Sequence, residues 1–346
     1  MRIADREISQ DSPPFILAEM SGNHNQALDR ALAIVDSAAK AGAHGMKLQT
    51  FTPEVITLDH HGELFTIESK DSLWSGRALI DLYREAWTPW DWHKPIMERA
   101  TSHGMVCFST PFHEDAVDFL EELEVPAYKV ASFESAHFPL LKKVAATGKP
   151  VIMSTGMATT VQLAESVKVL REAGCKELML LKCTSSYPAS PENSNLRTIP
   201  HLRELFDCEV GLSDHTPGIG VATSSVALGA TFIEKHFTLN RSDGGLDAEF
   251  SLEPDELKAL VEETHRAWQG LGRVHYGPTQ AEEGSLIFRR SLFVVEGISA
   301  GDEFTSKNLR IIRPGYGLEP KHIDLFLGRK AKSDLKAGTP VKWEHL

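Results

Sequence analysis

The chain contains 346 residues, more than one ordinary domain, so we expect a large domain followed by a small one. Hydrophobic residues make up 42% of it, which is enough for a full core. The 36 basic and 48 acidic side chains give a formal net charge of -12, and this balance argues against nucleic acids or anionic membranes as partners. An anionic ligand would therefore need a local basic pocket.

Residues 1–14 are charged and lack a long apolar stretch, and no segment approaches the roughly 20 apolar residues that a membrane span requires. We therefore expect a cytoplasmic protein. The four cysteines show no Cys-x-x-Cys spacing, which predicts reduced, packed thiols and neither disulfides nor a zinc site. These cysteines are Cys107, Cys175, Cys183 and Cys208.

Short apolar runs bounded by turn residues predict buried strands. They lie at residues 15–20, 45–49, 105–109, 127–131, 150–153, 178–183, 210–212 and 232–233. Helical spacing is found first at Leu28, Leu32, Val35 and Ala39, and helices are then expected at 92–103, 114–123, 139–146, 161–173, 219–230 and 254–270. Eight alternations of strand and helix in roughly 270 residues predict a (β/α)₈ TIM barrel.

Residues 50–87 interrupt this alternation, and we interpret them as an insertion over one face of the barrel. A segment of this length in a compact domain tends to be functional or disordered. No G-x-G-x-x-G or P-loop motif indicates a dinucleotide or nucleotide site.

Polar residues follow the predicted strands, at the carboxyl ends where TIM barrels place their active sites. They are Glu19, Lys47, Gln49, Thr110, Lys129, Ser132, Ser154, Ser185, Tyr187, Ser213, Asp214, His215, Glu234 and His236. Two lysines and several hydroxyls at one rim indicate an anion pocket. Each hydroxyl taken alone is equally typical of a helix N-cap.

His215 and His236 end the last two predicted strands, which a crossover helix would make parallel neighbours. Imidazoles at adjacent strand ends can share one divalent metal and leave coordination positions open for substrate. Two structural, hydrogen-bonded histidines are the alternative.

The alternation of predicted strands and helices ends at Gly272. We expect a barrel domain over residues 1–272, a linker at 273–287 and a small β-rich domain at 288–346, in which residues 298–305 loosely repeat as 335–342. Within that tail, Arg313 opens a turn rich in Pro and Gly that would present its side chain. Taken by itself, this residue is better explained as a solvated surface arginine.

Taken together, the motifs resemble the sialic acid synthase family, most closely its pseudaminic acid branch. The matching stretches are AEMSGNHNQ (18–26), KLQTFTP (47–53), FSTPF (108–112), YKVASFE (128–134), STGMAT (154–159), LKCTSSYP (181–188), GLSDHT (211–216), IEKHF (233–237) and IRPGYGL (312–318). Ser185 stands where the sialic acid branch typically has asparagine, and this departure favours the pseudaminic branch. The tail resembles that family's antifreeze-like (SAF) domain.

The resemblance implies condensation of phosphoenolpyruvate with the open-chain aldehyde of an acylated amino sugar, releasing phosphate and forming a nine-carbon 2-keto sugar acid. It also implies a divalent metal, commonly manganese, with magnesium or cobalt as alternatives. Family members are usually homodimers in which the antifreeze-like domain reaches the partner's barrel.

Roles for the residues follow from this chemistry. Phosphoenolpyruvate would bind Lys47, Thr110, Lys129, Ser132, Ser154, Ser185 and Ser213, while metal on His215 and His236 would polarise the aldehyde. Glu19 and Glu234 are candidates for activating water and stabilising the cation, and Asp247 for binding or orienting the sugar. Gln49 and Tyr187 are expected to line the sugar pocket, and Arg313 to meet the acylamino group from the other subunit.

Three sugars stay open as substrates: 2,4-diacetamido-2,4,6-trideoxy-altropyranose for pseudaminic acid, N-acetylmannosamine, and the legionaminic acid precursor. Two other functions also stay open. Lys47 and Lys129 both end strands, as the lysine of a Schiff-base aldolase would. The tail alone would suit a noncatalytic sugar-binding or ice-binding protein.

Overall fold

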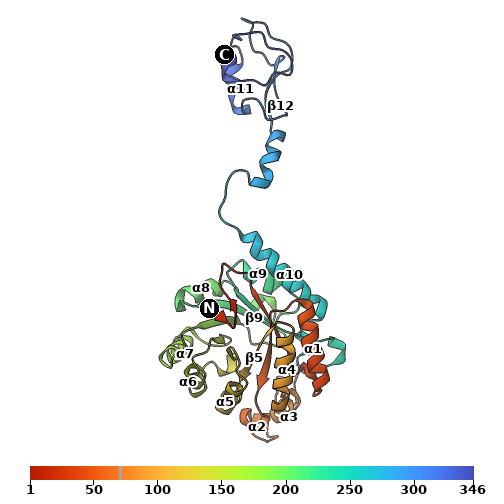
Figure 1. Ribbon diagram of the computed structural model, residues 1–346, viewed down its shortest axis with the longest axis vertical. Helices are drawn as coiled ribbons and strands as arrows, with labels where there is room; N and C mark the ends of the chain where they lie inside the picture. The colour runs from red at the N-terminus through yellow and green to blue at the C-terminus, as the bar shows by residue number, and fades with distance from the viewer. Residues whose placement is uncertain (70–71) are drawn as a thin grey trace. The chain divides into compact units, whose positions relative to one another are not determined.

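The computed structural model describes residues 1–69 and 72–346 (Figure 1). The chain divides into two compact units, Met1–Gly272 and Arg273–Leu346.

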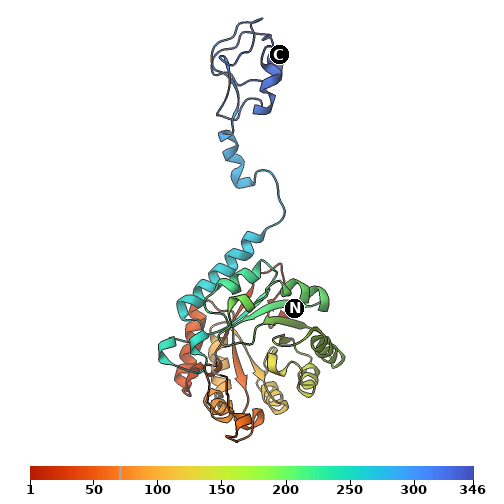
Figure 2. The same cartoon turned by 180° about the vertical axis from the view of Figure 1, so that it is seen from behind.

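The first unit is a closed barrel of eight parallel strands, and the predicted TIM barrel is confirmed (Figures 1 and 2). Neighbours pair in the order β10-β3-β4-β5-β6-β7-β8-β9. The strands are β3 (Phe15–Glu19), β4 (Gly45–Thr50), β5 (Val106–Pro111), β6 (Tyr128–Val130), β7 (Val151–Ser154), β8 (Leu178–Cys183), β9 (Glu209–Asp214) and β10 (Phe232–His236). Because helices cover the outside and side chains fill the inside, nearly every strand residue is buried, which explains the continuous apolar runs.

Eight helices follow the strands around the barrel. They are α1 (Leu28–Ala41), α4 (Trp90–Ser102), α5 (Glu114–Glu122), α6 (Phe138–Ala146), α7 (Thr160–Glu172), α8 (Thr198–Phe206), α9 (Gly220–Val226) and α10 (Pro254–Leu271). The sequence analysis did not locate α8, which has only nine residues and buries Ile199, Leu202 and Phe206. It also extended α9 too far, because the chain turns through Gly229, whose positive φ of 89° ends the helical path.

Two further segments lie outside the strand-helix repeat. Residues 2–7 form a short hairpin, β1 (Arg2–Ile3) with β2 (Arg6–Glu7), which was not predicted. The insertion between β4 and α4 contains α2 (Pro53–Ile56), the 3-10 turn η2 (Glu63–Phe65) and α3 (Leu79–Ala86). Lys70 and Asp71 of this insertion lie outside the described residues.

The second unit has its own small core, which includes Leu292, Val294, Phe304 and Phe326. It is built from the 3-10 helix η7 (Gln280–Phe288), the antiparallel pair β11 (Ser291–Val294) and β12 (Leu309–Ile312), the turn η8 (Pro320–His322), α11 (Ile323–Phe326) and η9 (Trp343–His345). The two copies of the sequence repeat pair with each other through the antiparallel bridge between Ile298 and Leu335. Part of the predicted linker is helical, because η7 begins at Gln280.

Over the described part of the chain, no helix combines the length and the apolar character that crossing a lipid bilayer would require.

Candidate active site

A cavity of about 350 Å³ opens where the barrel strands end. The polar part of its lining includes Gln49, Ser185 and His236 at the strand ends, together with Ser21 and Asp247 from the following turns. Side chains of the insertion, among them Ile56, Ile67, Trp74 and Leu79, line it as well. The insertion therefore forms part of the pocket.

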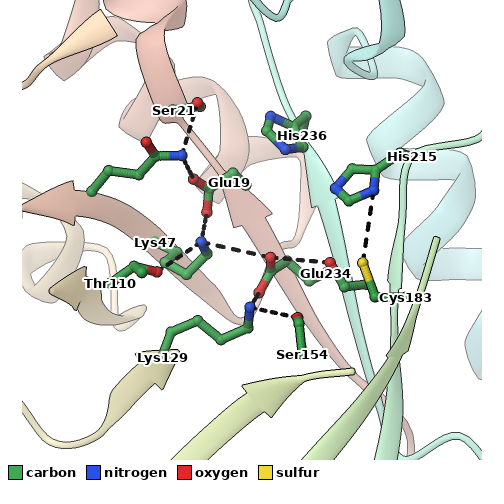
Figure 3. A network of polar contacts seen from close by, with 12 residues as sticks. Glu19, Ser21, Lys47, Thr110, Lys129, Ser154, Cys183, His215, Glu234 and His236 are labelled. Atoms are coloured by element: carbon green, nitrogen blue, oxygen red, sulfur yellow. Dashed lines mark hydrogen bonds and ion pairs between the residues drawn. The ribbon is translucent and has the colours of Figure 1, made fainter. Parts of the chain in front are cut away.

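Two carboxylates and two lysines meet inside the barrel beneath this cavity (Figure 3). Lys47 pairs closely with Glu19, and its Nζ lies 3.6 Å from Oε1 of Glu234. Nζ of Lys129 lies 3.6 Å from the other oxygen of Glu234. All four side chains are almost fully buried, so each charge depends on its neighbours for compensation.

The two carboxylates have different proton affinities. Burial raises the pKa of Glu19 to about 7, although Lys47 opposes the shift. Burial also acts to raise the pKa of Glu234, but Lys129, Lys47 and His215 together outweigh it and hold that pKa below its usual value. A buried pair whose pKa values are separated in this way can divide the work, one group exchanging a proton near neutral pH and the other staying ionised.

The predicted hydroxyls surround this charge cluster. Lys47 donates to Oγ1 of Thr110 at 3.1 Å and Lys129 donates to Oγ of Ser154 at 2.7 Å. The hydroxyl of Ser213 donates to Glu234 at 3.3 Å. The structure therefore brings together the residues that were predicted to hold an anion.

Gly156 lies in the loop after β7. The hydroxyls of Ser132, which follows β6, and of Ser185, which follows β8, both lie close to it. The backbone N–H of Gly156 donates to Oγ of Ser132 at 3.1 Å. A methyl group added to Gly156 would stand 2.7 Å from that oxygen and would overlap the hydroxyl of Ser185. The glycine thus keeps open the space between two hydroxyls that is suited to an anionic oxygen.

His215 and His236 lie side by side, with ring centroids 5.3 Å apart (Figure 3). Nδ1 of His215 donates to the carbonyl of Thr184 at 2.9 Å, which leaves Nε2 as its lone-pair nitrogen. Among the described residues, Nδ1 of His236 has no hydrogen-bond partner, and it is buried. Burial holds the pKa of His236 well below its usual range, and the nearby lysine ammonium groups act in the same direction, so its ring is neutral.

These features fit a divalent metal, because neutral imidazoles with a fixed tautomer are good ligands. Among the described residues, no group of three or more His, Cys, Asp and Glu side chains is arranged to hold an ion. The two histidines would therefore supply two ligands and leave the other positions to water or to substrate oxygens.

A chain of hydrogen bonds connects the turn after β10 to the charge cluster. Asp247 accepts a close hydrogen bond from the hydroxyl of Ser21. The amide of Gln49 donates to Oγ of Ser21 and to Oε1 of Glu19, both at 3.0 Å. Asp247 also lies 3.6 Å from Nδ1 of His236, so the structure places it in the site as predicted.

Tyr187 lines the cavity, with its ring 4.5 Å from that of His215. Asp214, predicted at the same rim, does not face the cavity. Its carboxylate pairs with buried Lys235 at 3.0 Å and accepts hydrogen bonds from Thr216. Adjacent residues of a strand point to opposite sides, and Ser213 and His215 therefore face inward while Asp214 does not.

Three polar residues of the site were not assigned roles in the sequence analysis. Ser21 lies in the AEMSGNHNQ stretch and connects Gln49 to Asp247. Glu134 lines the cavity, has a buried carboxyl oxygen with no hydrogen-bond partner among the described residues, and has its pKa raised to about 7 by burial. Cys183 places its Sγ 3.9 Å from Nδ1 of His215. All three lie at or near strand ends, and this position is the feature of the sequence that could have identified them as part of the site.

Arg313 belongs to the second unit, where it follows β12 and is exposed. Its predicted contact with the sugar remains a prediction.

Comparison with known proteins agrees with the motifs. Residues 34–276 match the NeuB family and residues 289–346 match the SAF domain. The pseudaminic acid synthase of Campylobacter jejuni is 41% identical, over 96% of both chains, and that of Helicobacter pylori is 39% identical, over 95% of this chain and 96% of the other. The crystal structure of N-acetylneuraminic acid synthetase from Leptospira borgpetersenii, with citrate, superposes with a TM-score of 0.73 at 31% identity, covering 83% of this chain and 94% of that one.

The fold and the site together define a TIM-barrel enzyme whose catalytic groups lie at the carboxyl ends of its strands. The match covers most of the barrel. The chain belongs to the NeuB family, and the resemblance to the sialic acid synthases is confirmed.

The space beside Gly156 provides a direct test of anion binding. We expect Gly156→Ala to weaken binding of phosphoenolpyruvate roughly tenfold or more, which is about 1.4 kcal/mol, because the new methyl displaces the hydroxyls of Ser132 and Ser185. Isothermal titration measures the affinity, and thermal unfolding should show little change because the displaced groups are small side chains. Gly220→Ala, at a position with open space, is the matched control. Unchanged affinity in Gly156→Ala would remove these hydroxyls from the anion site.

Proposed function

We propose that this protein is a pseudaminic acid synthase, which condenses phosphoenolpyruvate with the open-chain form of 2,4-diacetamido-2,4,6-trideoxy-β-L-altropyranose and releases phosphate. The observation that carries the proposal is the buried cluster of Glu19, Lys47, Lys129 and Glu234 beside the paired histidines. Support comes from relatives of that name at 41% and 39% identity.

Phosphoenolpyruvate would be held by Lys47 and Lys129, with donors from the surrounding hydroxyls. Charge-assisted hydrogen bonds of this kind are stronger than neutral ones, and they gain further strength where water is excluded. Both ammonium groups are buried and already hydrogen-bonded to hydroxyls, so they are positioned before the substrate arrives.

His215 and His236 would hold a divalent metal, which we propose is manganese. When bound, the metal supplies Lewis acidity that makes the aldehyde carbon of the sugar more electrophilic. Asp247 is close enough to His236 to orient that ring and to accept a hydrogen bond from a sugar hydroxyl. Gln49 and Tyr187 would contact the sugar from the same cavity.

The reaction begins when carbon 3 of phosphoenolpyruvate forms a bond to the aldehyde carbon, whose oxygen takes up a proton from solvent water. Carbon 2 becomes an oxocarbenium centre, and the ionised carboxylate of Glu234 stabilises its positive charge. Glu19, with its pKa near 7, removes a proton from the water that adds to carbon 2. The bond between carbon 2 and the phosphate oxygen then breaks as the new hydroxyl group on carbon 2 gives its proton to the departing phosphate, leaving the 2-keto acid and phosphate.

Phosphate release tests the proposed function. Purified enzyme with manganese and phosphoenolpyruvate should release phosphate with the altropyranose substrate, and far more slowly with N-acetylmannosamine or with the legionaminic acid precursor. Mass spectrometry of the product identifies the nine-carbon acid. Preferred turnover of either alternative sugar would overturn the assignment to pseudaminic acid, and the absence of phosphate release with all three would overturn the synthase reaction.

The pH dependence of kcat/KM tests the role of Glu19. A base must be deprotonated, so kcat/KM should rise as the pH increases through about 7, the pKa of this carboxyl. We expect Glu19→Gln to lose that inflection and to lower kcat roughly 10²–10⁴-fold. Titration of phosphoenolpyruvate itself affects wild type and variant alike, so the difference between the two profiles isolates Glu19. If the pH profile of the Glu19→Gln variant kept the same inflection, the inflection would belong to another group.

Removal of the metal tests the histidine pair. We expect EDTA to abolish turnover and manganese to restore it, because the two imidazoles supply the only protein ligands in the proposed site. His236→Ala should bind manganese more weakly than wild type in equilibrium dialysis. Full activity in the presence of the chelator would remove His215 and His236 from metal binding.

We also propose a homodimer in which Arg313 of one subunit contacts the acylamino group of the sugar in the partner's barrel. Arg313→Ala should raise the KM of the amino sugar at least roughly tenfold and change that of phosphoenolpyruvate little, since one lost charge-assisted contact is worth about 1.5–3 kcal/mol. Arg310→Ala, on the exposed side of β12, is the matched control. Equal losses for both substrates would contradict the role across the subunits.

A further inference from the structure

The cavity has a second, apolar side that the chemistry of condensation does not use. Ile56, Ile67, Leu79 and Leu82 of the insertion line it, and we call these four residues the apolar wall. The first three are only half-buried, so apolar surface still faces the cavity. A ligand that covered this surface with hydrocarbon would be favoured, whereas an unpaired hydroxyl placed there would lose its hydrogen bonds to water.

Aromatic residues that line the same cavity pack beside the apolar wall. The ring of buried Phe51 lies 6.0 Å from that of Tyr83 and 5.3 Å from that of Phe112, in edge-to-face contacts. Tyr83 belongs to α3, the same helix as Leu79 and Leu82. The helix is thereby fixed against the end of β4, and the apolar wall is a built surface.

Trp74 connects the insertion to the catalytic side of the cavity. Its indole N–H donates to the carbonyl of Leu246 at 3.1 Å, in the turn that carries Asp247. Its ring also lies 5.9 Å from that of Tyr187. These contacts hold the insertion beside the polar groups that would bind the reacting end of the sugar.

The candidate sugars differ in the atoms that such a wall would meet. The pseudaminic acid precursor carries a methyl group at C6 and an acetamido group at C4, whereas N-acetylmannosamine carries hydroxyl groups at both positions. Since C1 must reach the histidine pair, C4 and C6 lie toward the other end of the open chain. Among the described residues, the Tyr83 hydroxyl and the Glu134 carboxyl also line this cavity.

Building on the proposed function, we infer that the apolar wall is the specificity-determining surface for the sugar: it contacts the C6 methyl group and the C4 acetyl methyl group. It thereby selects 6-deoxy, 4-acetamido sugars over sugars with hydroxyls at these positions. Apolar pockets discriminate against an added hydroxyl by roughly 10²-fold at most. We therefore expect the wild-type enzyme to prefer the 6-deoxy sugar over its 6-hydroxy analogue by roughly 10–10²-fold in kcat/KM.

The test compares this preference in wild type, Ile67→Asn and Leu79→Asn. Both substitutions keep a similar side-chain size and place an amide where the C6 methyl would pack. We expect the preference to fall below roughly threefold in at least one variant, while the KM of phosphoenolpyruvate stays within about twofold. Val55→Thr, exposed on α2 in the same insertion, should keep the wild-type preference.

The ratio of kcat/KM for two sugars in one preparation does not depend on the fraction of folded enzyme, so partial unfolding of a variant cannot imitate the result. Equal use of both sugars by the wild type would overturn the inference. Retention of the full preference by both variants would do the same. Either result would leave the synthase reaction intact, whereas a wild type that turned over neither diacetamido sugar would overturn the proposed function as well.

Discussion

The site depends on the burial of two lysines and two glutamates at the mouth of a closed barrel. Removing one partner would leave an uncompensated buried charge, which destabilises far more than the pair stabilises. The parallel register places Glu19 beside Lys47 on β3 and β4, and Glu234 reaches both lysines from β10. Closure of the barrel is what allows strands distant in sequence to share these charges.

This cluster also explains how an acidic chain can bind a highly charged anion. With both carboxylates ionised, the four groups carry no net charge and offer phosphoenolpyruvate little attraction. Because burial raises the pKa of Glu19 to about 7, protonation of this group leaves the cluster with a surplus positive charge near neutral pH. Glu19 must lose this proton again before its carboxylate can take a proton from water, so anion binding and the later hydration step favour different protonation states of this group.

Much of the site could be predicted because barrel chemistry concentrates at strand ends, and the strands were recognisable as apolar runs. Side chains alternate between the two sides of a strand, and this rule would have separated Asp214 from Ser213 and His215. Asp214 was nevertheless placed in the pocket because it is polar. Helix α8 was missed although its buried residues Ile199, Leu202 and Phe206 recur at helical spacing, which was the available signal. The difference in pKa between Glu19 and Glu234 depends on distances across the barrel, which no local pattern contains.

The insertion shows where sequence reasoning reaches its limit. Its length indicated a function, and Leu79 and Leu82 stand at helical spacing within α3. Ile56 belongs to α2 and Ile67 to the loop between the helices, so the sequence does not show that the four residues share one wall. The insertion is held to the barrel by contacts that include the hydrogen bond from Trp74 to the carbonyl of Leu246 and those from Gln26 to the carbonyls of Glu85 and Trp87. The strand ends thus carry the charged groups proposed for the chemistry, while the inferred selection of the sugar belongs to a segment outside the strand-helix repeat.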